Sequence, residues 1–242
     1  PLFSTLKINW NLLEETKTVV RESIRYPEVF RAILGISWFW LIGTVFLSQL
    51  PTFAKNILHA NQQIVSLFFT LFSVGIATGA LICSRILKGE ISARYTPISC
   101  LGISLFTFDL CHTANHFIAP NLNGQFLDFF QFLSNATGLH LALDFLLLSI
   151  CGGIFIVPLY VILQDRSPSK SRARMIGSNN IFNALFMVIA SLFCILLLAL
   201  HLAITQIFLV VAWINGAIAF FSWPFWSFGQ IKFIARKLCK LL

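Results

Sequence analysis

The residues of this chain that could do chemistry gather near the ends of two hydrophobic stretches. Asp109, His112 and His116 follow one another at spacings i, i+3 and i+7, which places them on one face of a helix. His140 and Asp144 are four residues apart at the start of another apolar stretch. Such groups can bind a metal ion, but pairing between aspartate and histidine or hydration is simpler. We therefore expect a polar cluster of Asp109, His112 and His140, without a metal.

Several other polar side chains interrupt apolar segments. The sequence "SNNIFNALF" (178–186) holds Asn179, Asn180 and Asn183, which span about 100° around a helix. These amides could bond to a neighbouring helix, at about 0.6 kcal/mol per contact, or contact a substrate. Trp38 and Gln49 are eleven residues apart, so they share a helical face. An aromatic belt explains Trp38 as well as a substrate path does.

The elements that position these groups follow from the composition. The chain has 242 residues, of which 57% are hydrophobic and 11% are charged, and its mean hydropathy is +0.84. Soluble domains carry about 25% charged residues, so the sequence predicts a membrane protein. Spans of about 20 apolar residues joined by short loops predict an all-α bundle of six antiparallel transmembrane helices. These spans are Val29–Leu50, Ile64–Ile86, Pro97–His116, Leu139–Gln164, Met175–Leu200 and Ala203–Trp226.

The basic residues predict the orientation of the bundle. All but one of the 17 Lys and Arg residues lie before or at the start of the first span, at the end of the second span or after it, after the fourth, or after the sixth; the exception is Lys55. Because cytoplasmic loops are enriched in Lys and Arg, both termini are expected in the cytoplasm, with Asp109 and His140 toward the outer side. This distribution explains the net charge of +8 better than nucleic-acid binding does.

The chain is expected to divide into three parts. Residues 1–28 form a cytoplasmic lead-in with a short surface helix, residues 29–228 form the membrane bundle, and residues 229–242 form a basic cytoplasmic tail. The sequence begins with Pro1 and shows no secretory signal, so we expect a piece of a longer protein. It contains no GxSxG, HExxH or glycine-rich phosphate loop, and its six cysteines have no paired spacing. We therefore expect neither an enzyme nor a cofactor.

One loop resembles a transporter motif. The segment "GALICSRILKG" (79–89) is similar to the motif that follows the second helix of each half in the major facilitator superfamily. Gly79 matches its first glycine, Arg85 its basic residue and Gly89 its turn glycine. Ser84 stands in place of the usual acidic residue. More specifically, four segments resemble the second half of bacterial lysophospholipid transporters: "ILGISWFWLIGTVFLSQLP" (33–51), "LFSVGIATGALICSRILKG" (71–89), "GGIFIVPLYVILQDRSP" (152–168) and "RMIGSNNIFNALFMV" (174–188).

The resemblance implies a function. Members of that family move lysophospholipids, chiefly lysophosphatidylethanolamine, across the bacterial inner membrane, and some are fused to an acyltransferase and an acyl-acyl-carrier-protein synthetase. By this resemblance the chain is the C-terminal six-helix half of a transporter that works by alternating access, with an N-terminal six-helix half as its partner. The alternatives are a facilitator for another amphiphile or drug, and a membrane anchor for a fused or partner acyltransferase.

The resemblance also implies residue roles. Spans one and four would line the central cavity, and spans two and five would face the other half. The substrate-path candidates are then Trp38, Gln49, Asp144, Tyr160 and Gln164. The candidates for the contact between halves, or for the cytoplasmic gate, are Gly75, Gly79, Arg85, Gly89, Asn179, Asn180 and Asn183.

Overall fold

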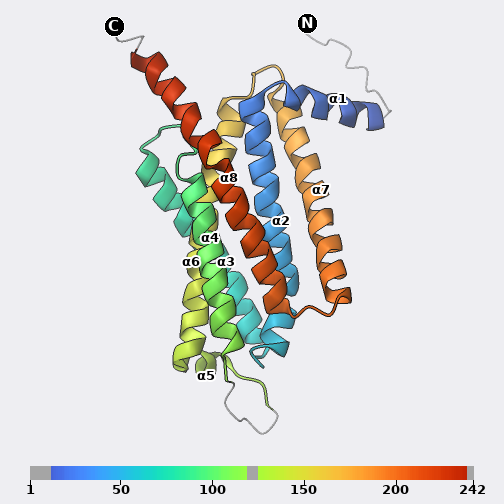
Figure 1. Ribbon diagram of the computed structural model, residues 1–242, viewed down its shortest axis with the longest axis vertical. Coiled ribbons are helices and arrows are strands. Elements are labelled where there is room, and N and C mark those ends of the chain that lie inside the picture. Colours follow the sequence, from blue (N-terminus) through green and yellow to red (C-terminus); the bar gives the residue numbers. More distant parts are fainter. Residues whose placement is uncertain (1–11, 119–124, 239–242) are drawn as a thin grey trace, which may run out of the picture.

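The computed structural model describes residues 12–118 and 125–238, which form a bundle of long helices (Figure 1). Within those ranges the backbone forms no strand, only one isolated bridge between Ala60 and Leu127. The helices are α1 (Leu12–Ile24), α2 (Pro27–Asn56), α3 (Gln62–Leu87), α4 (Thr96–Asn115), α5 (Phe129–Ser134), α6 (Ala136–Asp165), α7 (Arg172–Ala199) and α8 (Ile204–Leu238).

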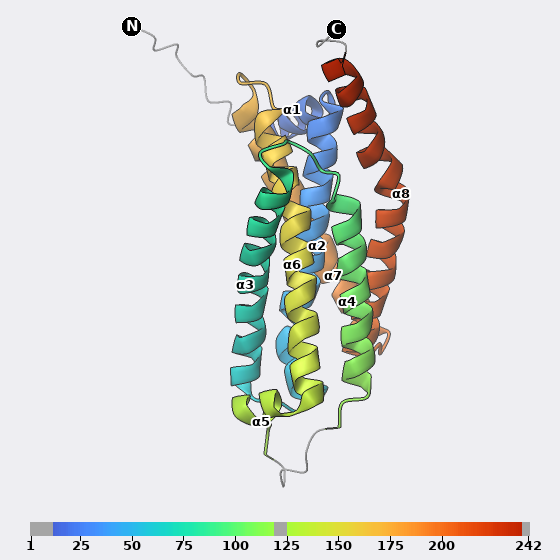
Figure 2. The same ribbon diagram turned by 90° about the vertical axis from the view of Figure 1, so that its left-hand side faces the viewer.

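Five of these helices are long and apolar enough to cross a membrane. They are α2, α3, α6, α7 and the Ile204–Ser222 part of α8. This is the architecture of an all-helical, multi-pass membrane protein. The third predicted span, α4, is 20 residues long but does not reach the same hydropathy. It nevertheless lies in the bundle between α6 and α8 (Figure 2).

Polar side chains, several of them buried hydroxyls, lower the hydropathy of α4. Ser99 and Thr107 donate hydrogen bonds to carbonyl oxygens of their own helix, and Ser104 donates to the carbonyl oxygen of Ala212 in α8. Each of these side chains is buried, and each is satisfied inside the protein. A helix can therefore sit inside an apolar bundle while its composition falls below the usual range for a span.

The six long helices form two triplets that exchange partners. In the first triplet, α2, α3 and α4 follow one another; in the second, α6, α7 and α8 do. The first helix of each triplet packs on the second helix of the other, so α2 lies against α7 and α6 lies against α3, while α4 packs on α8. Because α2 and α6 start at opposite ends of the bundle, the triplets have inverted directions (Figures 1 and 2).

Small residues bring α3 and α6 into backbone contact. A Cβ atom added at Gly79 would lie 2.1 Å from the carbonyl oxygen of Ile150, and one added at Gly153 would lie 2.4 Å from that of Ile76. At Gly75 it would lie 2.4 Å from the Ser149 Cβ atom. These glycines therefore face α6 of the same chain, and the contact with another half predicted for Gly75 and Gly79 stays a prediction.

Aromatic side chains fill the end of the bundle near α5. Phe46 stacks on Phe208 at 4.5 Å between ring centroids, and Phe68 meets Phe145 edge to face at 5.0 Å. Phe132 of α5 packs on Phe68 and is fully buried. A capping box, in which the Asp128 side chain accepts from the Gln131 backbone, starts this short helix. Phe132 of the aromatic segment before α6 is thus part of the core, whereas Phe126 and Phe130 are exposed.

At the opposite end of the bundle, α1 lies across the helix ends (Figure 1). Glu22 forms an ion pair with Arg174 at 3.0 Å, and Ser178 donates a hydrogen bond to Ser23 over 3.0 Å. The short helix predicted in this lead-in is α1, which begins at Leu12, where the described residues begin. At the other terminus, the α8 backbone continues through Leu238, so a helix extends into the predicted basic tail.

Candidate functional site

A groove of about 620 Å³ opens on the side of the bundle where α3 and α7 flank α2 and α6. Its walls are side chains from all four helices, and nearly all of its surface is apolar. Thr44 and Ser48 reach it, but their hydroxyls donate to carbonyl oxygens of α2 itself. The groove therefore offers an apolar molecule a hydrophobic surface with few polar groups that would bind water instead.

One polar pair marks the middle of the groove. The indole Nε1 of Trp40 donates a hydrogen bond to the Tyr160 hydroxyl over 3.2 Å, joining α2 to α6. Trp40 is 38% exposed, so its ring is available to a ligand. Beside it, Gly43 is buried, yet a Cβ atom added there would meet nothing within 4 Å. This glycine leaves space in the groove that a side chain would fill.

The predicted substrate-path residues divide between the groove and other places. Tyr160 lines the groove, whereas Trp38, Gln49, Asp144 and Gln164 do not. Trp38 points the other way because two residues rotate a helix by about 200°. Its indole donates to the Oδ1 atom of Asn215 in α8 over 2.9 Å. Trp38 therefore lies away from the groove, its place in a substrate path stays a prediction, and the exposed tryptophan of the groove is Trp40.

Asn215, which the sequence analysis did not single out, joins three helices. Its Nδ2 donates to the carbonyl oxygen of Cys100 over 2.7 Å and to Ser104 over 2.9 Å, while its Oδ1 accepts from Trp38. The side chain is only 1% exposed. A lone amide in the middle of an apolar span is the signal that could have identified it.

The asparagines of α7 have separate environments. Asn183 accepts a hydrogen bond from Ser37 of α2 over 2.8 Å, and Asn179 is buried with no partner for its Oδ1 atom. Only Asn180 is exposed. Asn183 therefore bonds within this chain and Asn179 is buried in it, while the role predicted for all three at a contact with another half stays a prediction.

The loop that resembles the transporter motif forms a tight turn. Lys88 and Gly89 both have positive φ angles, 47° and 82°. The angle at position 89 favours glycine, because a residue without a Cβ atom adopts it without steric strain. Arg85, one turn earlier, lies in the last turn of α3 and is exposed. The glycine of the motif is therefore explained by backbone geometry.

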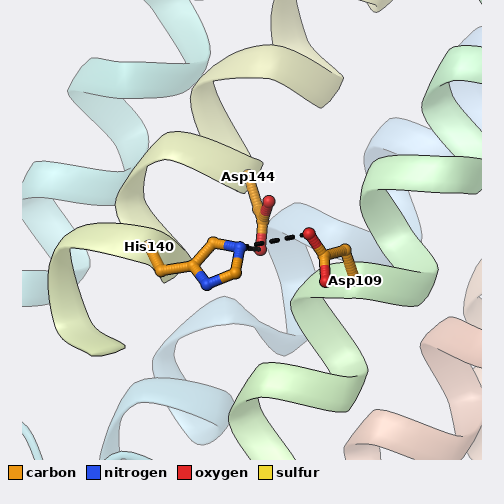
Figure 3. A network of polar contacts seen from close by, with 3 residues as sticks. All are labelled: Asp109, His140 and Asp144. Atoms are coloured by element: carbon orange, nitrogen blue, oxygen red, sulfur yellow. Dashed lines mark hydrogen bonds and ion pairs between the residues drawn. The ribbon is translucent and has the colours of Figure 1, made fainter. Parts of the chain in front are cut away.

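Two carboxylates and an imidazole meet where α4 packs on α6 (Figure 3). The His140 Nε2 atom lies 3.1 Å from the Asp109 Oδ2 atom and 3.6 Å from the Asp144 Oδ2 atom. Asp144 is 2% exposed, and its Oδ2 has no hydrogen-bond partner. Of the predicted cluster, Asp109 and His140 are in contact, but His112 instead lies against His116, with 4.6 Å between ring centroids. Asp144 belongs to this cluster and not to the groove.

The fold and these sites define the class of the protein as a helical, multi-pass membrane protein with an apolar side groove and a separate acid–histidine cluster. No protein-family model, curated protein or solved structure matches the chain. Its function must therefore be inferred from its own geometry and from the motifs in its sequence.

Proposed function

We propose that the chain is one six-helix half of a facilitator-type transporter, and that its groove takes the acyl chain of a lysophospholipid such as lysophosphatidylethanolamine. The observation that carries the proposal is the groove of about 620 Å³ between α2, α3, α6 and α7. Its apolar wall suits one acyl chain, and the Trp40–Tyr160 pair offers polar edges to the glycerol part of the lipid.

The arrangement of the helices supports a half-transporter. Two triplets with inverted directions and exchanged partners are the repeat found in each half of the major facilitator superfamily. The helices that border the groove, α3 and α7, are also the least buried of the candidate spans, at 28% and 11% of their apolar windows. An N-terminal half placed over these helices would close the groove, and rocking of the two halves would open it alternately to either side.

The charges support the orientation. The ends of α3 and α6 and the starts of α4 and α7 lie at the same end of the bundle as α1. This end carries Arg85, Arg94, Arg166 and Arg174, whereas the end near α5 carries Lys55. By the positive-inside rule, the α1 end would face the cytoplasm of a bacterial inner membrane. Lipid delivered there would be accessible to an acyltransferase, either fused or separate.

The test is co-expression of this chain with a six-span first half in spheroplasts that lack their lysophospholipid transporter. We expect labelled lysophosphatidylethanolamine to be taken up only when both halves are present. A chain carrying Gly43→Leu, which fills the groove, serves as the matched negative control. If both halves are shown to be inserted and uptake does not change, transport is refuted, and the membrane-anchor alternative is favoured instead.

A further inference from the structure

The cluster of Asp109, His140 and Asp144 has the atoms and spacing of a metal site. The nearest atoms of the three side chains, two carboxylate oxygens and one imidazole nitrogen, all lie within 4.8 Å of one another. In a tetrahedral zinc site with bonds of about 2.0–2.1 Å, ligand atoms are about 3.3–3.4 Å apart. The observed distances from His140 Nε2, 3.1 and 3.6 Å, bracket that spacing.

The buried carboxylate is the second observation that points to a cation. The Asp144 side chain is 3% exposed, and its Oδ2 atom, which is turned toward His140, has no hydrogen-bond partner. A buried anionic oxygen that accepts no hydrogen bond is costly, particularly among apolar helices. Sequence spacing alone does not reveal the three-residue cluster, because Asp109 lies in α4, whereas His140 and Asp144 lie in α6.

Formal charge favours a divalent ion. With a neutral imidazole, the three side chains carry two negative charges, and with a protonated one they carry a net charge of −1. In the described part of the chain, the ion pairs of both carboxylates are made with His140 alone. A divalent cation bound to two carboxylates and a neutral imidazole makes the site neutral, which is the least costly state in a membrane protein.

The ligand types indicate which cation. Magnesium and calcium prefer sites made entirely of oxygen, whereas imidazole is a preferred ligand of zinc and its transition-metal neighbours. The side chains of His140 and Asp109 are 51% and 45% exposed, so a fourth position can be filled by water. We propose that Asp109, His140 and Asp144 bind a divalent transition-metal ion of the zinc type, which clamps α4 to α6.

This metal site is independent of the proposed transport function, since it lies outside the groove. It can be tested on the purified full chain in detergent after metal has been removed with a chelator. Cobalt(II) replaces zinc in such sites and gives a visible absorption band when it is four-coordinate. We expect one equivalent of cobalt to saturate this band and one equivalent of zinc to abolish it.

Single substitutions locate the ion. Asp109→Asn, His140→Gln and Asp144→Asn should each weaken cobalt binding by at least about tenfold. The matched control is the double variant His112→Gln/His116→Gln, because two histidines one helical turn apart can bind metal on their own. The control should bind cobalt like the unmodified chain. Absorption lost in this control and retained in the three single variants would overturn the proposal, as would no binding by the unmodified chain.

Thermal unfolding gives a second readout. Zinc that binds the folded state should raise the unfolding temperature of the unmodified chain and of the His112/His116 control. It should leave Asp144→Asn unchanged. If that variant does not fold, Asp109→Asn provides the same comparison, since the Asp109 side chain is nearly half exposed. An equal zinc-dependent rise in the single variants and the unmodified chain would refute this site.

Discussion

Trp40 and Tyr160 are joined across the groove by a hydrogen bond of 3.2 Å from the indole Nε1 atom to the phenol oxygen. These residues are 120 positions apart in sequence, and they belong to α2 and α6, the first helices of the two triplets. The bond therefore ties the two inverted triplets together at the surface where we propose that lipid binds. It also fixes the orientation of an exposed indole, which prepares the groove for an amphiphile.

Filling the groove at Gly43 should prevent lipid binding without harming the fold. A Cβ atom there meets nothing within 4 Å, so Gly43→Leu directs its side chain into open space. We expect the Kd for a fluorescent lysophospholipid to rise at least about fivefold, equivalent to about 1 kcal/mol. Gly43→Ala is the matched control and should change the Kd less than twofold. Equal binding by both variants would show that the lipid binds elsewhere.

Gly79→Ala should destabilise the bundle, in contrast to Gly43→Ala. The new methyl group would meet the Ile150 carbonyl oxygen and the Gly153 Cα atom, which are backbone atoms that cannot move independently. Overpacking of this kind costs about 1–3 kcal/mol, which exceeds the gain of up to about 1 kcal/mol from helix propensity. Thermal unfolding followed by tryptophan fluorescence should give a lower midpoint for Gly79→Ala. A midpoint at or above that of Gly43→Ala would contradict the tight contact of α3 with α6.

Replacing Asn180 and Asn183 by leucine should have different effects on stability. Asn183→Leu removes the acceptor of the Ser37 hydroxyl and should cost about 0.5–2 kcal/mol of stability. Asn180→Leu changes an exposed side chain, so the unfolding temperature should stay within about 1 °C. Of the three asparagines only Asn180 is exposed, so if the proposed second half contacts this face, its variant should reduce uptake in the co-expression assay. Normal uptake by Asn180→Leu would exclude it from the gate.

Replacing Asn215 should loosen three helices at once. Asn215→Leu leaves the Trp38 indole, the Cys100 carbonyl oxygen and the Ser104 hydroxyl each without one partner. A loss of about 1–3 kcal/mol is expected, because Cys100 and Ser104 are buried where water cannot replace the bond. Thermal unfolding compared with the Asn180→Leu variant isolates the effect. If both variants unfold at the same temperature, the Asn215 bonds contribute nothing measurable.

The positions of most long helices could be predicted, because a run of about 20 apolar residues indicates a membrane-spanning helix. The predicted span 64–86 is observed as Gln62–Leu87, and the span 175–200 as Arg172–Ala199. The first span was predicted to end at Leu50, but α2 continues through Pro51 to Asn56. A proline removes only one backbone donor, and near a helix end the chain tolerates this loss.

The partners of each helical face could not be predicted in the same way. Spacing shows that Trp38 and Trp40 point in different directions, but the side on which α8 packs decides which of them is buried. Likewise, the predicted outer cluster required α4 to lie against α6. His112, which is about 60° around the helix from Asp109, lies against His116 instead. The groove itself depends on four helices, so no local pattern could reveal Gly43 as the residue that leaves it open.

The exchange of partners between the triplets has a consequence for biosynthesis. When α3 enters the membrane, the segment that covers Gly75 and Gly79 is still roughly 70 residues from being made. At about 5–20 residues per second, synthesis takes roughly 4–15 s to supply it. During that interval the glycine face of α3 is open to lipid or to other proteins. An insertion factor that shields this face would then act at a defined time, after α3 and before α6.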